Sequence, residues 1–414
     1  MGASGVMAQR QAYDVIIVGA RCAGSATAML MARRGHSVLL LDADRFPSDF
    51  EASTHLLWQS GAARLAKWGL LDRLRETGCP SIRKITLDLA VMSLEGNAPA
   101  ADGIDEAFCP RRLVLDELLL EAAQEAGVEF HQESRVRELI MQDGRVHGVR
   151  WTTADGGTEE ATCRMLIGAD GASSPVAKMV DAPVLDEHPR HEGIIWAYFD
   201  NFPAEGMEFY SRPRRMLMVY PTNNGQSLVG SCVHQEDYAE VAREADTRML
   251  EEFEALAPSL AARTRQATQS SRWLTRSTKG FRRQATGPGW ALVGDAGLTM
   301  DPITAAGISN AFRDADLLSA AVHDGLAAGA DIDAVVARFQ DERDAVSIPL
   351  YEFAKESSKL EPPPQPIMDL FGALPGQQDA IDQYFGVFAQ TVPVSEFFAE
   401  ANFVRIMSGQ SQTA

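Results

Sequence analysis

A glycine-rich turn near the N-terminus is the first place where residue types and spacing could bind a ligand. Gly19 and Gly24 lie in the segment GARCAG, directly after a β-branched run at residues 14–18. Their spacing matches the first and third glycines of the fingerprint G-x-G-x-x-G, which binds dinucleotides, but Arg21 stands at the middle position. We expect its guanidinium either to fold over the phosphates as a counter-charge or to face solvent.

The elements around this turn are those that a dinucleotide site requires. Residues 25–34 form a predicted helix that ends at Gly35, and residues 37–41 form a second buried strand that ends at Asp42. Asp42 lies eighteen residues after Gly24, close to the spacing at which a carboxylate accepts hydrogen bonds from an adenosine ribose. The helix N-terminus would present unpaired N–H groups to a pyrophosphate.

Two later glycine-containing segments also follow predicted strands. GADGASSPVA, residues 168–177, contains Ser174 and Pro175, which are typical of a helix N-cap and its first turn. GDAGLTMDPITAAGI, residues 294–308, ends with small residues at 305–307 that are predicted to open a helix through Leu318. The dipole of that helix favours negative charge at its N-terminus.

The three segments, in this order, resemble those of the group A flavin monooxygenases (aromatic hydroxylases). This superfamily of glutathione-reductase-type FAD proteins also contains flavin halogenases and geranylgeranyl reductases. The resemblance extends over residues 19–308 and implies FAD as cofactor, with NADPH or NADH as reductant. It also implies an α/β fold, in which a Rossmann FAD domain is interleaved with an antiparallel-sheet substrate domain and followed by C-terminal helices.

The resemblance implies roles for individual residues. Asp295 would bind a ribityl hydroxyl of FAD, and the helix opened by residues 305–307 would lie at the N1 and O2 edge of the flavin. Arg112, in the pattern R-x-x-L-D-x-x-L, would reach the FAD phosphates. The adjacent Arg111 is the alternative residue for this role, and Arg112 could also be a surface charge at the start of a helix. Ala177 stands where the family has an arginine, so the NAD(P)H contact of this motif is not carried over. The residues expected at the cofactor are Gly19, Ala20, Arg21, Cys22, Ala23, Gly24, Asp42, Ala43, Arg112, Asp170, Gly294, Asp295, Pro302, Ala305, Ala306, Gly307 and Ile308.

The reaction of such hydroxylases needs few catalytic side chains. NAD(P)H reduces FAD, oxygen adds at flavin C4a, and the terminal oxygen of the hydroperoxide passes to an electron-rich substrate. His55, in EASTHLLWQSG, is the candidate catalytic residue: it could deprotonate a phenol or steady the peroxide, or be a core histidine. Strands expected within residues 190–235 supply candidate pocket residues, which could equally be plain core: Trp196, Phe209, Tyr210, Met216, Met218 and Tyr220.

The predicted domains are discontinuous. The FAD-binding domain is expected to comprise residues 10–84, 108–180 and 271–330, and the substrate-binding sheet domain residues 85–107 and 181–270. Residues 331–414 form a predicted helical region that could cap the pocket or bury a dimer contact.

Composition excludes several classes of protein. With 414 residues and a net charge of −19, the chain repels phosphate backbones, so we expect no nucleic-acid partner. Neither a membrane-length apolar run nor a signal peptide is present, so we expect a cytoplasmic protein with no membrane partner, either a monomer or a homodimer. Five scattered cysteines without a C-x-x-C pair predict neither disulfides nor a metal site.

The function expected first is NAD(P)H-dependent hydroxylation of a hydrophobic, aromatic or polyketide-like small molecule. The main alternative is an FAD-dependent reductase or dehydrogenase of the geranylgeranyl reductase kind, because Leu298 stands where hydroxylases often have histidine. A halogenase is less expected, since Met216 and Met218 replace the tryptophans of the halogenase segment W-x-W-x-I-P. A non-catalytic flavoprotein or an NAD-binding regulator is a third class.

Overall fold

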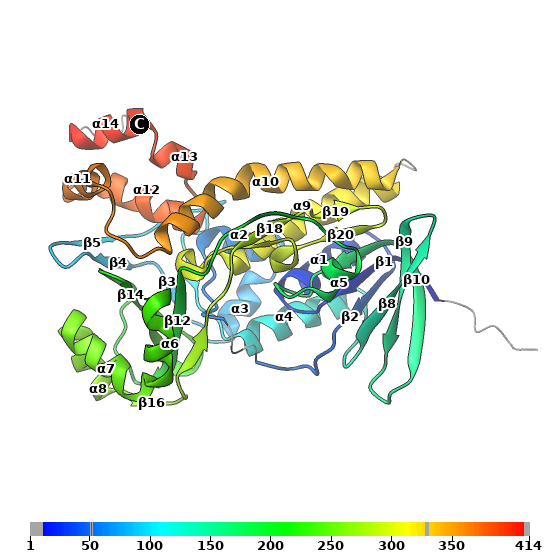
Figure 1. Ribbon diagram of the computed structural model, residues 1–414, viewed down its shortest axis with the longest axis horizontal. Coiled ribbons are helices and arrows are strands. Elements are labelled where there is room, and N and C mark those ends of the chain that lie inside the picture. The colour runs from blue at the N-terminus through cyan, green and yellow to red at the C-terminus, as the bar shows by residue number, and fades with distance from the viewer. Residues whose placement is uncertain (1–10, 50, 52, 328–330, 410–414) are drawn as a thin grey trace, which may run out of the picture.

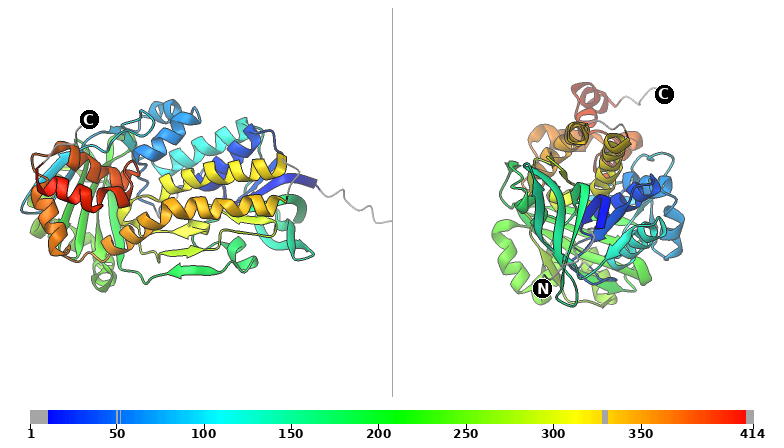
Figure 2. Two further views of the ribbon diagram at one scale, coloured as in Figure 1. Left: turned by 90° about the horizontal axis from the view of Figure 1, so that it is seen from above. Right: turned by 90° about the vertical axis from the view of Figure 1, so that its right-hand side faces the viewer.

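The computed structural model describes residues 11–49, 51, 53–327 and 331–409. Two large β-sheets lie toward opposite ends of an elongated molecule (Figure 1). Two long helices, α9 (Gly307–Ala327) and α10 (Ile332–Ser357), pack side by side along it (Figure 2). This arrangement confirms the α/β fold predicted from the sequence.

The first sheet carries the glycine turn. Strands β20, β10, β1, β2 and β7 are parallel neighbours in this order, whereas β19 and the β8–β9 hairpin pair antiparallel at its sides. Strands β1 and β2 are largely buried, as expected for parallel strands covered by helices. The strands are β1 (Gln11–Val18), β2 (Val38–Leu41), β7 (Glu129–His131), β8 (Arg135–Gln142), β9 (Arg145–Thr152), β10 (Thr158–Gly168), β19 (Thr286–Gly287) and β20 (Trp290–Leu292).

The second sheet is antiparallel except where β13 runs parallel to β4. Its order is β16-β12-β15-β14-β13-β4-β5, with β17 also paired to β12. Because β17 ends at Arg276, this sheet extends beyond the expected boundary at residue 270. The strands are β4 (Ile85–Asp88), β5 (Ser93–Gly96), β12 (Glu192–Asp200), β13 (Met207–Arg212), β14 (Arg215–Pro221), β15 (Gln226–His234), β16 (Thr268–Gln269) and β17 (Leu274–Arg276).

Small sheets and helices complete the described part. A three-stranded sheet joins β11 (Val184–Glu187), β18 (Phe281–Arg283) and β21 (Leu298–Thr299), and β3 (Ser81–Ile82) pairs with β6 (Ala107–Phe108). The remaining α-helices are α1 (Cys22–Arg33), α2 (Gln59–Lys67), α3 (Leu71–Glu76), α4 (Arg112–Glu125), α5 (Pro175–Met179), α6 (Gln235–Arg243), α7 (Ala245–Leu256), α8 (Pro258–Gln266), α11 (Gln365–Ala373), α12 (Gln378–Ala389), α13 (Val394–Phe397) and α14 (Glu400–Met407). Short 3-10 turns are η1 (Asn223–Gly225), η2 (Gly294–Ala296) and η3 (Pro302–Thr304).

Local expectations agree with the structure where glycine decides the backbone. Gly35 ends α1 with a φ of +85°, as predicted. Asp143 and Gly144, with φ of +49° and +78°, form the turn of the predicted hairpin. Helix α1 starts three residues earlier than expected because Cys22 to Gly24 are already helical, and α9 runs nine residues beyond the expected Leu318.

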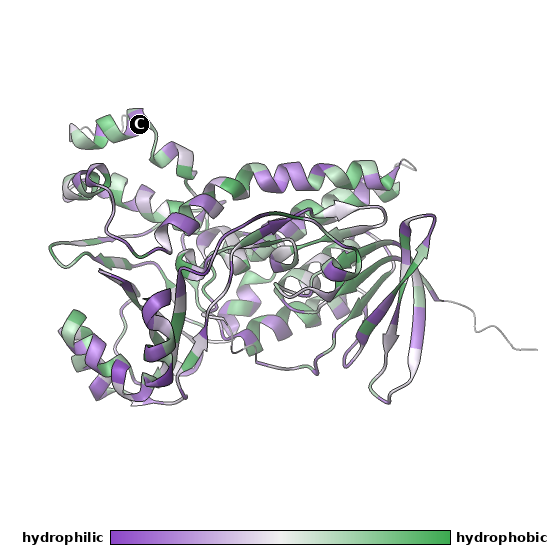
Figure 3. Ribbon diagram, viewed as in Figure 1, coloured by the Kyte–Doolittle hydropathy of each residue, from purple (hydrophilic) through white to green (hydrophobic). Residues whose placement is uncertain are grey.

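Apolar residues gather between the layers. Figure 3 shows mostly hydrophobic strands in the parallel sheet, whereas α6 and α10 carry hydrophilic residues among their turns. One core cluster packs α1, α4 and α9 on the parallel sheet, and another joins the second sheet to α11 and α12. Within the residues described, no helix has the length and apolar character needed to cross a membrane.

Candidate active site

The glycine turn has no room for side chains at two of its positions. Gly19 has a φ of +104°, and a Cβ there would lie 2.4 Å from the carbonyl oxygen of Ala169. A Cβ at Gly24 would lie 1.7 Å from the carbonyl oxygen of Gly19. The turn can therefore fold closely on the neighbouring strand end only with glycine at both positions. Cys22 and Ala23, whose N–H groups have no acceptor within α1, line the adjacent cavity.

Arg21 is held by carboxylates. Its φ of −92° is open to any residue, so the missing middle glycine leaves the backbone of the turn unstrained. The guanidinium donates to Asp116 at 3.0 Å, to Asp44 at 3.1 Å and to Ser48 at 3.1 Å. Its side chain is 19% exposed and lines the cavity, so the expectation of a freely solvated side chain is wrong.

Asp42 lies at the end of β2, beside the cavity, as predicted. One carboxylate oxygen accepts from the Ala20 N–H at 2.6 Å, and the other accepts from the Asp44 N–H at 2.8 Å. Burial raises the pKa of this carboxyl, and the two backbone donors oppose the shift. These bonds fix the carboxylate next to Ala43, another cavity residue, where further acceptor positions can meet a ribose.

Asp170 organises a helix start as well as the cavity wall. Its oxygens accept from the Ser174 hydroxyl at 2.5 Å and from the Val176 N–H at 2.9 Å. Ser174 in turn accepts from the Ala177 N–H at 2.8 Å, which confirms the predicted N-cap. Asp170 lines the cavity, and its two bonds at the start of α5 also shape the loop there; its expected contact with the cofactor stays a prediction.

A guanidinium that sequence reasoning missed lies beside this loop. Arg283 contacts the carbonyl oxygens of Ala172, at 3.4 Å, and Ala296, at 3.0 Å. Burial raises the pKa of Asp170, and the charge of Arg283 opposes this shift. Ala177, where the family motif has arginine, is buried. Arg283 comes from β18, more than a hundred residues away, so no local motif indicates it.

Asp295 is the carboxylate best placed to receive a ligand hydroxyl. It lies on η2, directly after β20, and lines the cavity. No described residue donates a hydrogen bond to its side chain, and burial raises its pKa against the opposing charges of Arg276 and Arg112. A cavity-lining carboxylate to which no described residue donates keeps its acceptor positions for a ligand, and it fits the ribityl hydroxyl expected there.

The start of α9 forms another wall. Ala305 adopts a left-handed φ of +50°, so α9 begins at Gly307, two residues later than expected. A Cβ on Gly307 would meet no protein atom within 4 Å, because the space beside it is the cavity. Ile308 and Pro302 line the same wall, which places the N-terminal end of a 21-residue helix against the cavity.

The two neighbouring arginines take different positions. Arg112 is buried, binds both oxygens of Asp116 at 2.9 and 3.0 Å, and lines the cavity. Arg111 points elsewhere: it binds Asp49 at 2.7 Å and its guanidinium lies 3.8 Å from the centre of the Tyr198 ring. Arg112 is therefore the arginine that can reach a bound phosphate.

His55 lies in the cavity wall with both ring nitrogens engaged. Nε2 lies 2.5 Å from the hydroxyl of Tyr198, and Nδ1 lies 3.4 Å from Sγ of Cys109. Burial, with the positive charges of Arg111 and Arg112, lowers its pKa to about 3. The imidazole is therefore neutral near pH 7 and a weak proton acceptor. Its φ of +45° is a strained value for a non-glycine residue, as is common at functional sites.

The candidate substrate residues lie on two different faces of the second sheet, because side chains alternate along each strand. Trp196 lines the cavity, and it shares one face of the second sheet with Phe209, Met216, Met218 and Tyr220, which pack under the C-terminal helices instead of lining the cavity. Tyr210 does not belong with them, because it lies on the opposite face against α6 to α8 and binds Glu208 and Arg263.

One cavity of about 560 Å³ joins these groups. It extends from Asp42 and the glycine turn to His55, Ile194 and Trp196. Four expected cofactor residues do not line the cavity but lie behind its wall, where their small side chains let neighbouring backbone segments pack closely: Ala20, Gly24, Gly294 and Ala306. Lining residues that sequence reasoning missed include Ser53, Ser134, Arg135, Arg276, Thr278, Met300, Asp301 and Asn310.

Comparisons with known proteins agree with this site. A family model described as FAD binding domain matches residues 12–354. Over 239 residues the chain is 32% identical to digeranylgeranylglycerophospholipid reductase 2 of Methanothermobacter thermautotrophicus, which covers 55% of this chain and 59% of the reductase.

Two solved structures share the fold. The flavin-dependent brominase Bmp2 superposes with a TM-score of 0.79 at 18% identity, with 96% of this chain and 98% of that chain covered. The protein pqsL of Pseudomonas aeruginosa, described as a probable FAD-dependent monooxygenase, superposes with a TM-score of 0.69 at 22% identity, with 92% and 100% covered.

Proposed function

Because the chain belongs to the FAD binding domain family and is an FAD-dependent oxidoreductase, we propose that it is an NAD(P)H-dependent monooxygenase. Its proposed substrate is a hydrophobic, aromatic or polyketide-like small molecule that it hydroxylates with oxygen. The observation that carries the proposal is the continuity of the cavity: it joins the cofactor residues to the Trp196 side of the second sheet. A volume of about 560 Å³ lies within the usual range of small-molecule pockets.

The chain's own residues hold the cofactor in this proposal. The first N–H groups of α1 and Arg112 bind the phosphates, Asp42 binds the ribose, and Asp295 binds a ribityl hydroxyl. When bound, FAD supplies hydride acceptance from NAD(P)H and the activation of oxygen. The N-terminal end of α9 stabilises negative charge beside Gly307 and Ile308.

Apolar walls exclude water from the substrate end. Ile194, Trp196 and Leu298 are buried and line the cavity there, next to Met300. A low-dielectric wall of this kind would keep water from the reacting centre and leaves orientation of the substrate as the main task of the protein.

His55 acts in this proposal as a neutral positioning group. A pKa of about 3 removes it as a general base near neutral pH, and its bond to Tyr198 fixes the ring. The proposal therefore assigns no proton transfer to His55.

A reductase that moves hydride without oxygen is the second candidate. The observation that favours it is the 32% identity to the archaeal reductase over 239 residues. Both candidates use the same FAD site and differ in the fate of oxygen.

The experiment that separates them is turnover under ¹⁸O₂. FAD-loaded protein is mixed without oxygen with NADPH or NADH, the visible absorbance of the flavin is followed, and ¹⁸O₂ is then admitted with a panel of phenols and aromatic polyketides. We expect bleaching by a nicotinamide, followed by a product that carries one ¹⁸O atom. Bleaching followed by a reduced product that carries no ¹⁸O would replace the monooxygenase proposal by the reductase proposal.

A matched pair of variants tests the position of the substrate. Trp196→Leu, in the cavity wall, should raise KM and release more hydrogen peroxide per NAD(P)H consumed. Tyr210→Phe, on the opposite face of the same sheet, should leave both unchanged. Equal effects of the two variants would contradict the proposed pocket.

A further inference from the structure

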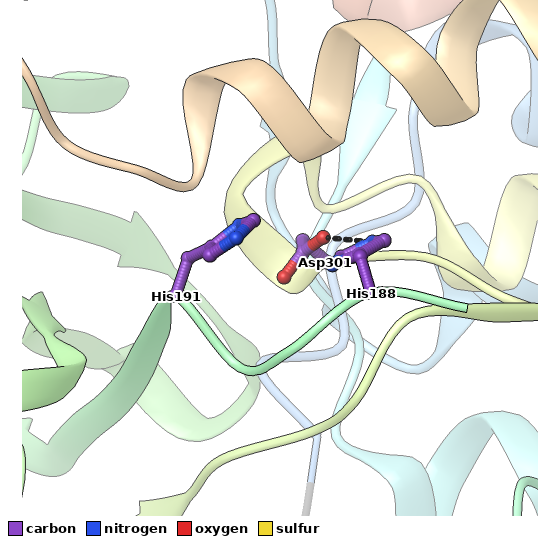
Figure 4. A group of neighbouring side chains, drawn as sticks. All are labelled: His188, His191 and Asp301. Atoms are coloured by element: carbon purple, nitrogen blue, oxygen red, sulfur yellow. Dashed lines mark ion pairs between the residues drawn. The ribbon is translucent and has the colours of Figure 1, made fainter.

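Two histidines and an aspartate from separate segments converge beside the cavity. His188 and His191 lie in the connection between β11 and β12, and Asp301 lies between β21 and η3 (Figure 4). One ring nitrogen of each histidine and one carboxylate oxygen lie within 4.8 Å of one another. We call this group the His–His–Asp cluster. The sequence predicted no metal site, and this cluster arises only from the tertiary structure.

The hydrogen bonds of both imidazoles leave the same nitrogen available. Nδ1 of His188 lies 3.0 Å from the carbonyl oxygen of Pro189, which only accepts, so this Nδ1 carries a proton. Nδ1 of His191 lies 3.0 Å from the Ser358 hydroxyl, whose own proton goes to the carbonyl oxygen of Lys355 at 2.9 Å. With Nδ1 protonated, each ring in its neutral form presents a lone pair at Nε2, the usual arrangement of histidines whose second nitrogen fixes them for a metal.

Asp301 lacks a matching donor. Its side chain is buried at 1% exposure, and in the part of the chain that the structure describes neither oxygen has an aligned hydrogen bond. Nε2 of His188 lies 3.0 Å from Oδ2, but the contact is misaligned for a hydrogen bond. When a nitrogen and an oxygen bind the same ion, the lone pair of each atom points at the ion. The two atoms then lie close together without an aligned hydrogen bond between them.

We propose that His188, His191 and Asp301 bind a divalent transition-metal ion of the zinc type. Zinc bonds to nitrogen and oxygen are about 2.0–2.2 Å long, so two ligands at angles between a right angle and the tetrahedral angle lie about 2.8–3.5 Å apart. The 3.0 Å contact between His188 and Asp301 falls in this range, whereas the separations within the cluster extend to 4.8 Å, so the side chains must move closer together on binding the ion. Two imidazoles, one carboxylate and a water complete a four-coordinate zinc site.

The fold makes room for this site. A Cβ on Gly280 would lie 2.1 Å from Nε2 of His188, so only glycine permits the ring at this place. The two imidazoles are stacked, with centroids 5.1 Å apart and an interplanar angle of 12°. The bound ion would tie the strand that carries Trp196 to the segment before Pro302, and both of these residues line the cavity. Its role is structural, because no electron or proton transfer is assigned to it.

Metal binding to the full FAD-loaded chain tests the proposal. Protein stripped with EDTA is titrated with Zn²⁺ by calorimetry, and the metal retained after desalting is measured by mass spectrometry. We expect one Zn²⁺ per chain, and at least about tenfold weaker binding for each of His188→Gln, His191→Gln and Asp301→Asn. His36→Gln is the matched control: His36 lies 2.9 Å from His323 but has no place in the His–His–Asp cluster, so its variant should bind as the wild type does.

A measurement on the wild type covers the case in which a variant fails to fold. X-ray absorption at the zinc edge should show nitrogen and oxygen ligands only, with the scattering of two imidazoles. Either a wild-type protein that retains no Zn²⁺, or Zn²⁺ binding that the three variants leave unchanged, would overturn the proposal. The first result would identify a buried His188–Asp301 ion pair, and the second an adventitious surface site.

Discussion

Replacement of Asp295 by alanine should separate cofactor affinity from folding stability. The carboxylate lines the cavity, receives no hydrogen bond from a described residue, and has a pKa raised by burial. In the FAD-free protein its removal takes away a desolvated charge and no hydrogen bond. In the FAD complex the same change removes a charged acceptor from a ligand hydroxyl.

The size of the effect follows from that one bond. A hydrogen bond to a charged group contributes about 1.5–3 kcal/mol, and about 1.4 kcal/mol changes an equilibrium constant tenfold. The Kd of FAD should therefore rise roughly 10- to 150-fold in Asp295→Ala. The free energy of unfolding of the FAD-free protein should stay the same or increase.

Asp170→Ala is the matched comparison. Asp170 is also a cavity carboxylate, but it holds the Ser174 hydroxyl and the Val176 N–H at the start of α5. Loss of this cap should lower the free energy of unfolding by about 1–2 kcal/mol. Both variants are measured by urea unfolding without FAD and by fluorescence titration of the FAD-free protein with FAD.

The reasoning fails if Asp295→Ala changes the Kd of FAD by less than about threefold, well below the range given by one charged hydrogen bond. It also fails if this variant loses as much unfolding free energy as Asp170→Ala, because the carboxylate would then have a protein partner.

Three further changes address the turn, the buried ion pair and the histidine. Gly24→Ala places a Cβ 1.7 Å from the carbonyl oxygen of Gly19, so the purified variant should carry almost no FAD, measured as flavin absorbance per chain. Arg112→Ala leaves the 1% exposed Asp116 without its bidentate partner, and urea unfolding should show a loss of about 3–5 kcal/mol. His55 has its pKa lowered to about 3 in the folded protein against 6.5 when unfolded, so below pH 6.5 the unfolded chain binds a proton that the folded chain excludes. Stability therefore falls as the pH falls, by about 1.4 kcal/mol per pH unit, and between pH 7 and pH 5 the wild type should lose about 2 kcal/mol more than His55→Gln.

Each of these changes has an outcome that contradicts it. Gly372→Ala is the control for the turn, because a Cβ there meets no atom within 4 Å and should leave the FAD content unchanged. A stability loss in Arg112→Ala below about 1 kcal/mol would mean that Arg21 alone neutralises Asp116. Equal pH dependence of the wild type and His55→Gln would show that the imidazole is not desolvated in the folded protein.

Local features of the cofactor site could be predicted from the sequence because they depend on neighbouring residues. Gly19 is required by its positive φ and Gly24 by the nearby carbonyl oxygen of Gly19, and Ser174 caps a helix that begins at the next residue. The clash that a side chain at Gly19 would have with Ala169 comes from a distant segment. Hydrophobic periodicity placed several strands within a few residues of their observed ends, but it ended α9 nine residues too early. The starts of α1 and α9 were shifted, since turn residues there adopt helical or left-handed angles that periodicity does not encode.

Contacts between distant segments could not be predicted in this way. The assignment of Tyr210 to the pocket was wrong because side chains alternate between the two faces of a strand, and strand pairing, not residue type, decides which face meets the cavity. Arg283 reaches the loop after β10 from a strand far along the chain. Burial and the charges of Arg111 and Arg112 lower the pKa of His55, and its ring contacts Tyr198 and Cys109; no motif connects these residues to it.

The sequence by itself determined that the chain folds around a dinucleotide, because the spacing of glycines and carboxylates at strand ends is a local property of the backbone. Only the tertiary structure decided which of these groups are free to meet a ligand. Asp170 and Asp295 both follow strands next to glycines and both line the cavity, yet Asp170 also holds the start of α5, whereas no described residue donates to the side chain of Asp295. The physical reason is that hydrogen-bond saturation and desolvation depend on every neighbour that packing brings close, and most of these neighbours are remote in the chain.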